Sequence, residues 1–232
     1  MGRAIRDYFE RRPGYPLRVL SPQFEEDEFP VSTLFRSLEE MPSLEREALR
    51  LCQGRVLDVG AGAGCHSLYL QEQGLQVTAV DISPLSVETM RRRGVSDVRL
   101  ADFFTDNVGD AYDTVLLLMN GLGISGTLGR LPRLLERCAA LLAANGCVLA
   151  DSSDLCYLYE DEDGQLEDLP EGRYYGEVDY TMCYGSIQSP PYTWLYVDFE
   201  TLRRVADAAG FHAECVACGS HYDYLARLVP RR

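Results

Sequence analysis

A glycine at every second position over residues 60–64 is the feature that most constrains how this chain folds. The apolar segment Val56–Val59 runs straight into Gly60, Gly62 and Gly64, and a helical pattern follows. Glycine has no Cβ and adopts positive φ angles without steric cost, so it lets the main chain approach a ligand closely. The following helix directs its positive end at the same place. The segment therefore predicts a strand–loop–helix unit that binds a ligand through its backbone.

The spacing of these glycines separates two ligand classes. The dinucleotide pattern G-x-G-x-x-G needs a glycine at its sixth position, where this chain has Cys65 counted from Gly60, or Ser67 counted from Gly62. The acidic-x-Gly-x-Gly-x-Gly pattern from Asp58 to Gly64 instead resembles motif I of the class I S-adenosylmethionine (SAM) dependent methyltransferases. In that family the loop wraps the amino-acid end of SAM, and the leading acid, here Asp58, helps to hold its ammonium group. A carboxylate attracts such a cation, whereas it repels a pyrophosphate.

Carboxylates also end the next two predicted strands. Residues 76–80 lead into Asp81, an acid roughly twenty residues past the loop, placed to accept hydrogen bonds from ribose hydroxyls. Residues 97–101 lead into Asp102 and Phe103, which the resemblance assigns to the adenine amino group and ring. By this resemblance the residues expected to bind SAM are Asp58, Gly60, Ala61, Gly62, Gly64, Asp81, Ile82, Asp102, Phe103 and Asn120.

Strands and helices alternate from residue 55 onward. The expected strands are 55–59, 76–80, 97–101, 112–118 and 146–151, and the expected helices are 64–73, 84–93 and 127–143, the last one closed by Asn145-Gly146. A capped helix from Asp198 to Gly210 and two strands, 212–218 and 222–228, end the chain. Continuous apolar runs indicate strands buried on both faces. The predicted fold is therefore α/β, a doubly wound, mostly parallel seven-stranded sheet of order 3-2-1-4-5-7-6 with the last strand antiparallel.

Two additions to this pattern are expected within a single methyltransferase domain, 1–232. Residues 1–50 predict helices over 4–12 and 32–51, with a new capped segment from Ser43, and by the resemblance they form a lid over the cofactor. Arg36 in this lid faces either solvent or a substrate carboxylate. Residues 155–197, between strand 5 and the last helix, contain an acidic turn at 160–164 and an alternating stretch, 176–184, that predicts an added antiparallel strand. Their aromatic side chains predict a substrate pocket or a small satellite core.

Composition restricts the partners. The chain of 232 residues has 36 acidic and 22 basic residues and a net charge of −14, which disfavours nucleic acid because phosphates require a basic surface. No apolar run is long enough to cross a membrane, and the charged N-terminus lacks a signal-peptide core. We therefore expect a cytoplasmic protein with eight reduced cysteines and a small-molecule or peptide substrate. The oligomeric state stays open.

The candidates for catalysis follow the fourth and fifth predicted strands. Asn120 either contacts the methyl donor or substrate or only forms a turn, and it lacks the Pro-Pro-aromatic sequence of methyltransferases that modify amino groups in nucleic acids or proteins. Asp154 is the first candidate for a general base or substrate contact, with a capping role as the alternative. His221, at the turn between the last two strands, is the second candidate base or a plain turn residue.

A possible zinc site competes with this interpretation of the C-terminal strands. His212, Cys215, Cys218 and His221 stand at intervals of three, and Cys-x-x-Cys is a common zinc element. On a regular strand this interval puts successive members on opposite faces. We therefore predict no metal site.

The sequence thus predicts a SAM-dependent methyltransferase that acts on a small molecule or a peptide by in-line methyl transfer. Two alternatives stay open. A non-catalytic SAM-binding or regulatory domain would keep the glycines and Asp81, and an NAD-dependent oxidoreductase is less favoured because the third dinucleotide glycine is missing.

Overall fold

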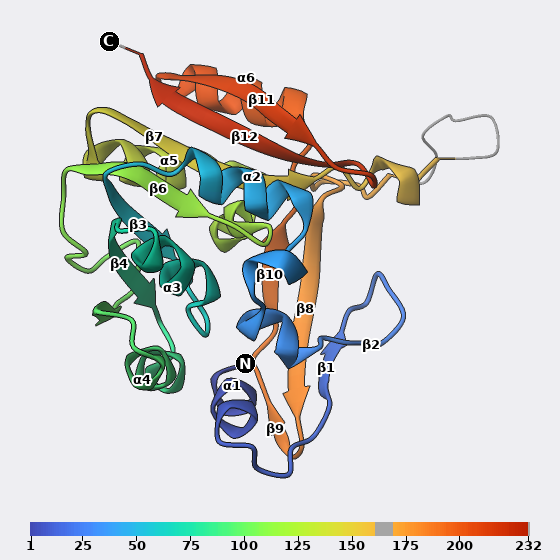
Figure 1. Cartoon of the computed structure of the whole chain (residues 1–232). Coiled ribbons are helices and arrows are strands. Elements are labelled where there is room, and N and C mark those ends of the chain that lie inside the picture. Colours follow the sequence, from blue (N-terminus) through green and yellow to red (C-terminus); the bar gives the residue numbers. More distant parts are fainter. Residues whose placement is uncertain (161–168, 232) are drawn as a thin grey trace.

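Seven strands form one twisted sheet in the computed structural model, which describes residues 1–160 and 169–231 (Figure 1). These strands are β3 (Arg55–Val59), β4 (Gln76–Asp81), β5 (Asp97–Leu100), β6 (Tyr112–Leu117), β7 (Leu142–Ser153), β11 (Phe211–Cys218) and β12 (Asp223–Pro230). Their spatial order is β11-β12-β7-β6-β3-β4-β5, with β3 to β7 mutually parallel and β12 antiparallel to both of its neighbours. The predicted fold class and strand order are confirmed.

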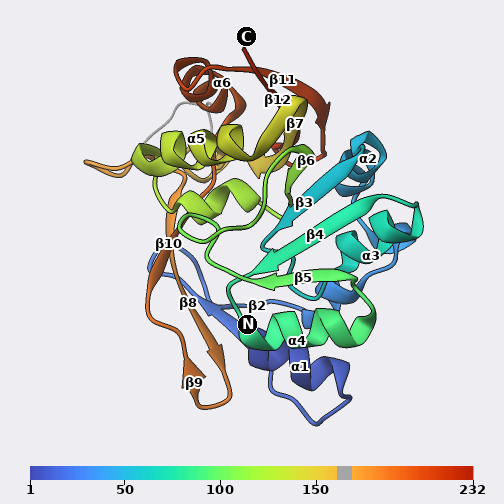
Figure 2. The ribbon, with the colours of Figure 1, turned by 90° about the vertical axis from the view of Figure 1, so that its left-hand side faces the viewer.

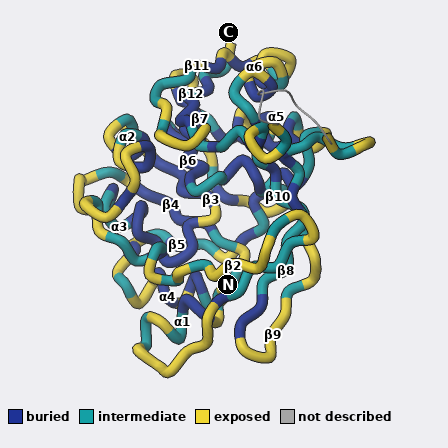
Figure 3. Tube along the Cα trace, turned by 90° about the vertical axis from the view of Figure 1, so that its right-hand side faces the viewer, coloured by how far each residue is buried: buried dark blue, intermediate teal, exposed yellow. Residues whose placement is uncertain are grey.

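Helices cover both faces of this sheet (Figure 2). The helices are α2 (Ser43–Leu51), α3 (Cys65–Glu72) and α4 (Pro84–Arg93) on one face, and α5 (Leu131–Leu141) and α6 (Phe199–Ala208) on the other. Because side chains alternate along a strand, Leu57 of β3 packs with α5 whereas its neighbour Val56 packs with α2. Both faces of the sheet are therefore excluded from solvent, as the apolar strands predict. Figure 3 shows buried residues along the strands of this sheet.

The N-terminal helix prediction is partly wrong. Helix α1 (Gly2–Phe9) agrees with the expected first helix, but residues 32–51 form two short 3₁₀ turns, η1 (Val31–Phe35) and η2 (Leu38–Glu40), before α2. Arg36 and Met41 are extended, with ψ angles of 147° and 145°, and Met41 precedes a proline, which disfavours a helical conformation. Ser37 and Glu40 form the capping box, so the capped segment lies at η2 rather than at Ser43.

The Asn145-Gly146 pair does not end a helix, which is a second correction. Helix α5 stops at Leu141, and both residues lie inside β7, where the pairing with β6 shifts register between Leu142 and Cys147. A Cβ placed on Gly146 would lie 2.6 Å from the carbonyl oxygen of Tyr112. Glycine is therefore needed here for the close approach of β6 at an irregular strand pair, and not for a left-handed helix end.

A second sheet, which was not predicted, joins the N-terminal residues to the insertion. The expected added strand is confirmed as β8 (Glu177–Tyr184), and it pairs antiparallel with β1 (Leu17–Leu20) and β10 (Tyr192–Leu195). Two short strands complete this sheet. Strand β2 (Asp27–Glu28) pairs with β1, and β9 (Ile187–Gln188) pairs with β8. Residues 161–164 of the predicted acidic turn lie outside the described residues.

Three further 3₁₀ turns complete the secondary structure. They are η3 (Gly121–Ser125), η4 (Leu128–Arg130) and η5 (Cys156–Leu158). Within residues 1–160 and 169–231, no helix combines the length and the apolar character that crossing a bilayer requires.

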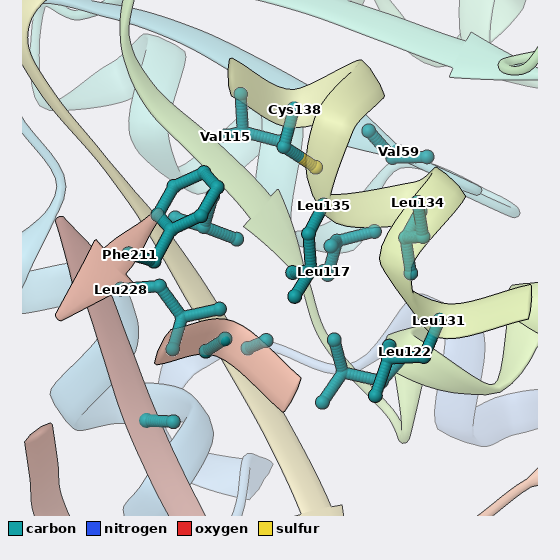
Figure 4. Close-up of a cluster of buried hydrophobic side chains, with 14 of the residues drawn as sticks. Val59, Val115, Leu117, Leu122, Leu131, Leu134, Leu135, Cys138, Phe211 and Leu228 are labelled. Carbon is teal, nitrogen blue, oxygen red and sulfur yellow. The ribbon is translucent and has the colours of Figure 1, made fainter. Parts of the chain in front are cut away.

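The apolar core between α5 and the sheet contributes to the free energy of unfolding. Leu134 is fully buried there, together with Leu117 of β6 and Leu228 of β12 (Figure 4). We expect Leu134→Ala to lower the free energy of unfolding by about 2–5 kcal/mol because the truncation leaves a cavity. Leu100 is 53% exposed, so Leu100→Ala should cost less than about 1 kcal/mol. Equal losses in urea denaturation of the two variants would contradict this packing.

Candidate functional site

The loop between β3 and α3 presents bare main chain at the carboxyl edge of the sheet. Gly60, Gly62 and Gly64 have φ angles of +70°, +59° and +80°, which side-chain-bearing residues rarely adopt. The N–H groups of Gly60 and Ala61 both donate to the carbonyl oxygen of Val80, at 2.8 and 3.0 Å, and this fixes the loop on β4. A Cβ on Gly60 would meet no atom within 4 Å. The structure therefore leaves open space over Gly60 for a ligand.

Asp81 lies beside this loop, as expected from the sequence. One carboxylate oxygen accepts the Gly62 N–H at 2.9 Å and the other accepts the Ser83 N–H at 2.7 Å. Burial raises the pKa of Asp81, and the charge of Asp58 adds to this effect, while the two N–H groups oppose it. Ile82, the next residue, is 71% exposed. An acid bound to the loop and an exposed apolar side chain thus stand together at the end of β4.

Asp58 does not reach the open side of the loop. Its side chain is buried below the loop, on the sheet face that carries α2 and α3, and one oxygen accepts a hydrogen bond from the Ser67 hydroxyl at 2.5 Å. Burial raises its pKa. The expected contact with the cofactor ammonium stays a prediction, and the side-chain partner of Asp58 in the structure is Ser67 of α3.

Asp102 and Phe103 follow β5, but they face different ways. Asp102 lies at the carboxyl edge and accepts the Phe104 N–H at 2.8 Å. Phe103 is 6% exposed and points into the core, where its ring meets that of Phe104 at 5.7 Å. Ile82 is exposed at this part of the edge, whereas Phe103 is not.

N-terminal residues lie on the glycine loop. Ile5 and Leu34 pack with Ala63 of the loop, and Phe35 and Met119 border the same cluster. Helix α1 also packs against α4, and both figures of the ribbon show the two helices side by side (Figures 1 and 2). The position agrees with a lid, and the lid function itself stays a prediction.

A buried charge network joins the N-terminal segment to the first turn of α3, directly after the loop. Arg36 donates from one nitrogen to both carboxylate oxygens of Glu45, at 2.8 Å each, and Glu45 contacts Nε2 of His66 at 2.7 Å. Burial lowers the pKa of His66, but Cys65 and Glu45 outweigh it, so the pKa is well above its ordinary value. The Arg36 side chain is only 14% exposed, so it does not face solvent. Its Nε is buried without a hydrogen-bond partner among the described residues.

Asn120 is held in a strained turn after β6. Met119 and Asn120 have φ angles of +60° and +56°, a left-handed conformation that non-glycine residues adopt at a cost of about 1–3 kcal/mol. The Asn120 N–H donates to Asp151 of β7 at 2.9 Å, and its carbonyl oxygen accepts the indole N–H of Trp194 of β10 at 3.0 Å. A Cβ on Gly123 would lie 2.0 Å from the same indole nitrogen. Asp151 and Trp194 are site residues that sequence reasoning missed.

Asp154 follows the end of β7, and a backbone hydrogen bond joins it to the turn that contains His221. The Asp154 N–H donates to the carbonyl oxygen of Tyr222 at 2.9 Å, next to His221 in the turn before β12. The Asp154 carboxylate accepts the Cys156 N–H at 2.9 Å, which is the capping alternative, and also the Tyr175 hydroxyl at 2.7 Å. His221 is exposed. We call the residues at the carboxyl ends of β6 and β7, namely Asn120 and 151–154, the β6–β7 edge.

Aromatic side chains from the insertion gather beside the β6–β7 edge. The rings of Tyr157 and Tyr222 stack at 5.2 Å, and Tyr192 meets Trp194 edge to face at 6.3 Å. The hydroxyls of Tyr180 and Tyr196 lie 3.1 Å apart. Burial is the main cause that raises the pKa of both hydroxyls, so they are neutral hydrogen-bonding groups at neutral pH.

His212, Cys215, Cys218 and His221 do not come together as one cluster. Cys215 and Cys218 lie with their sulfurs 3.6 Å apart, because β11 has a register shift between Cys215 and Ala217. The expectation that alternation separates these two cysteines is therefore wrong: the extra residue of a bulge restores a common face. Residues 1–160 and 169–231 contain no group of three or more His, Cys, Asp or Glu side chains arranged to hold a metal.

Residues 56–146 match a family model described as a methyltransferase domain. Over its full length the chain is 51% identical to a SAM-dependent methyltransferase of Bacteroides fragilis, crystallised with S-adenosyl-L-homocysteine, with 94% of that chain covered and a TM-score of 0.93. A 23S rRNA (uracil(747)-C(5))-methyltransferase of Pyrococcus horikoshii is 33% identical over 82 residues, which are 33% of this chain and only 20% of that relative. The sugar N-methyltransferase KedS8 of a Streptoalloteichus species, 20% identical, has the same fold with a TM-score of 0.58 over 86% of this chain and 88% of its own.

Asp151 should make the stability of this site depend on pH. Burial raises its pKa to about 7, and Glu45 adds to this effect, while the Asn120 N–H and His66 oppose it. The folded state then holds this proton more tightly than the unfolded state, so unfolding releases it and stability falls as pH rises from about 4 to about 7. Wild type should therefore lose stability relative to Asp151→Asn across this range and level off above it. Parallel urea-denaturation profiles of the two proteins from pH 4 to 8 would refute the assignment.

Proposed function

The chain belongs to the class I SAM-dependent methyltransferases, and we propose that it transfers the SAM methyl group to a small molecule or a peptide held at the β6–β7 edge. SAM is its cofactor, and methyl transfer replaces the two alternatives left open by the sequence, a non-catalytic SAM-binding domain and an NAD-dependent oxidoreductase. The acceptor class goes beyond the family assignment. The observation that supports it is the contact of Trp194, from the aromatic insertion, with Asn120 at the end of β6.

The residues present fit SAM at the glycine loop. Open space over Gly60 admits a ligand against the main chain, and Asp81 supplies carboxylate oxygens beside it for the ribose hydroxyls. Asp102 is proposed for the adenine amino group, with exposed Ile82 as the apolar wall in place of the buried Phe103. The orphaned Nε of Arg36 is a donor for a carboxylate, which suits the amino-acid end of SAM.

SAM supplies an electrophilic methyl group on a sulfonium that is already a good leaving group, so the protein mainly has to orient the acceptor and exclude water. The strained Asn120 turn, fixed by Asp151 and Trp194, provides a rigid wall for that orientation. A base is needed only for an acceptor that arrives protonated. Asp154 stays the first candidate for that base and His221 the second, and the Tyr175 hydroxyl on Asp154 would set its orientation.

The acidic surface supports an acceptor other than nucleic acid. A net charge of −14 opposes the approach of a phosphate backbone. The rRNA methyltransferase match is confined to 82 residues, a fifth of that relative. We also propose a cytoplasmic location, in which the eight cysteines would be kept reduced.

Asp81→Ala should weaken the binding of S-adenosylhomocysteine by about 1.5–3 kcal/mol, because charge-assisted hydrogen bonds to the ligand are lost. Isothermal titration calorimetry measures this change. Asp110→Ala is the control, since Asp110 is an exposed acid away from the loop. Unchanged affinity in Asp81→Ala would remove Asp81 from the ribose role, and wild type that binds NAD but neither SAM nor S-adenosylhomocysteine would overturn the function.

Methyl-labelled SAM tests the acceptor class. We expect the protein to transfer label to the small-molecule or peptide fraction of a cell extract and not to its purified RNA. Trp194→Phe keeps a smaller aromatic ring but loses the N–H donated to Asn120, so it should reduce the rate of label transfer while S-adenosylhomocysteine still binds. Label that enters RNA alone would refute the proposed acceptor class without affecting the cofactor assignment.

A further inference from the structure

Cys215 and Cys218 form an exposed dithiol that the methyltransferase reaction does not use. Their sulfurs are 3.6 Å apart, and the Cys215 thiol also lies 3.5 Å from the carbonyl oxygen of Ala217. Cys218 is exposed and Cys215 partly exposed, whereas Cys65, Cys138, Cys147 and Cys183 are buried. Thiol pairs that an oxidant can reach are the ones that oxidise selectively.

The bulge in β11 is what brings the two thiols together. Cys215 pairs with Ala226 and Ala217 pairs with Leu225, so Val216 is the extra residue. Without it, residues three apart on a strand would point to opposite faces. The end of the strand is fixed as well, because the Gly219 N–H donates to the carbonyl oxygen of Asp223 at 2.8 Å. The fold therefore holds the dithiol together on one surface.

We propose that Cys215 and Cys218 are a reversible redox modification site, which forms an intramolecular disulfide with a small disulfide oxidant of the glutathione disulfide class. The exposed Cys218 thiolate attacks one sulfur of the oxidant, forming a mixed disulfide and releasing one thiolate. Cys215 then loses its proton to solvent and attacks Cys218 Sγ, which releases the second thiol. The two cysteines lose two electrons and two protons, and one oxidant molecule becomes two thiols.

The geometry and the acidity of the thiols agree with this order. A disulfide bond is about 2.05 Å long, so the sulfurs need to approach by only about 1.5 Å. Burial raises the pKa of the Cys215 thiol to about 11, and its contact with Cys218 adds to the effect. Cys215 is therefore a poor first nucleophile and acts as the resolving thiol, once Cys218 has become the electrophile.

The site lies next to the β6–β7 edge. Three residues separate Cys218 from Tyr222, whose carbonyl oxygen accepts the Asp154 N–H and whose ring stacks on Tyr157. The modification site itself depends only on the two thiols and does not rest on the proposed acceptor.

Trypsin cleaves after Arg204 and after Arg227. It therefore releases the peptide Val205–Arg227, which contains Cys215 and Cys218 and no other cysteine. The full-length protein is incubated with glutathione disulfide, free thiols are blocked with N-ethylmaleimide, and this peptide is weighed by mass spectrometry. We expect a peptide lighter by two hydrogen atoms that carries no maleimide, and dithiothreitol should restore two reactive thiols.

Two single variants separate the steps. Cys215→Ser should accumulate the glutathione adduct on Cys218, because the resolving thiol is absent. Cys218→Ser should leave Cys215 largely unmodified under the same conditions. A wild-type peptide that stays doubly alkylated, or that keeps a stable glutathione adduct, would overturn the proposal, as would equal reactivity of the two single variants. Circular dichroism checks that both variants are folded.

Discussion

The attachment of the glycine loop to β4 is the interaction on which the rest of the site depends. Val80 accepts two loop N–H groups through its carbonyl oxygen, and Asp81 accepts a third, from Gly62, through its carboxylate. These contacts fix the loop in which Gly60, Gly62 and Gly64 have positive φ angles and the main chain is bare. They also place the carboxylate expected to meet the ribose directly beside the loop. Asp81 thus holds the loop in place and is also expected to bind the ligand.

The second sheet connects the two sides of the site. Strand β1 comes from the N-terminal segment, which lies on the glycine loop, and β8 and β10 come from the insertion, which contacts the β6–β7 edge. The β1–β8 ladder therefore joins the two parts directly through backbone hydrogen bonds. Figure 1 shows this sheet standing beside the seven-stranded one. An enzyme that must cover its cofactor and orient an acceptor gains from a common support for both tasks.

Local patterns in the sequence predicted the seven-stranded sheet because each signal acts over a few residues. Apolar strands, the Ser83-Pro84 start of α4 and the Asp198 cap of α6 are signals of this kind. The partners of β1 could not be predicted, since its pairing with β8 spans most of the chain. The helix expected at 32–51 is interrupted at Arg36, whose side chain pairs with Glu45, and at Met41, where the following proline favours extended backbone.

Site residues were predictable where a motif gives the position of the backbone, and less so where only the direction of a side chain decides. Asp81 and Ile82 stand at the loop as expected, whereas Phe103 turns into the core and Asp58 lies beneath the loop. Asp151 and Trp194 carried no motif, because their importance comes from contacts with Asn120 made across three strands. The Cys215–Cys218 pair required a bulge that strand alternation does not predict.

A crystal structure of this protein with S-adenosylhomocysteine would show directly whether the glycine loop and Asp81 bind the cofactor. We expect the amino-acid end of the ligand against the main chain at Gly60, the ribose hydroxyls on the Asp81 carboxylate, and the sulfur directed at Asn120. A ligand bound elsewhere, or bound here with Asp81 out of hydrogen-bond reach of the ribose, would contradict this expectation.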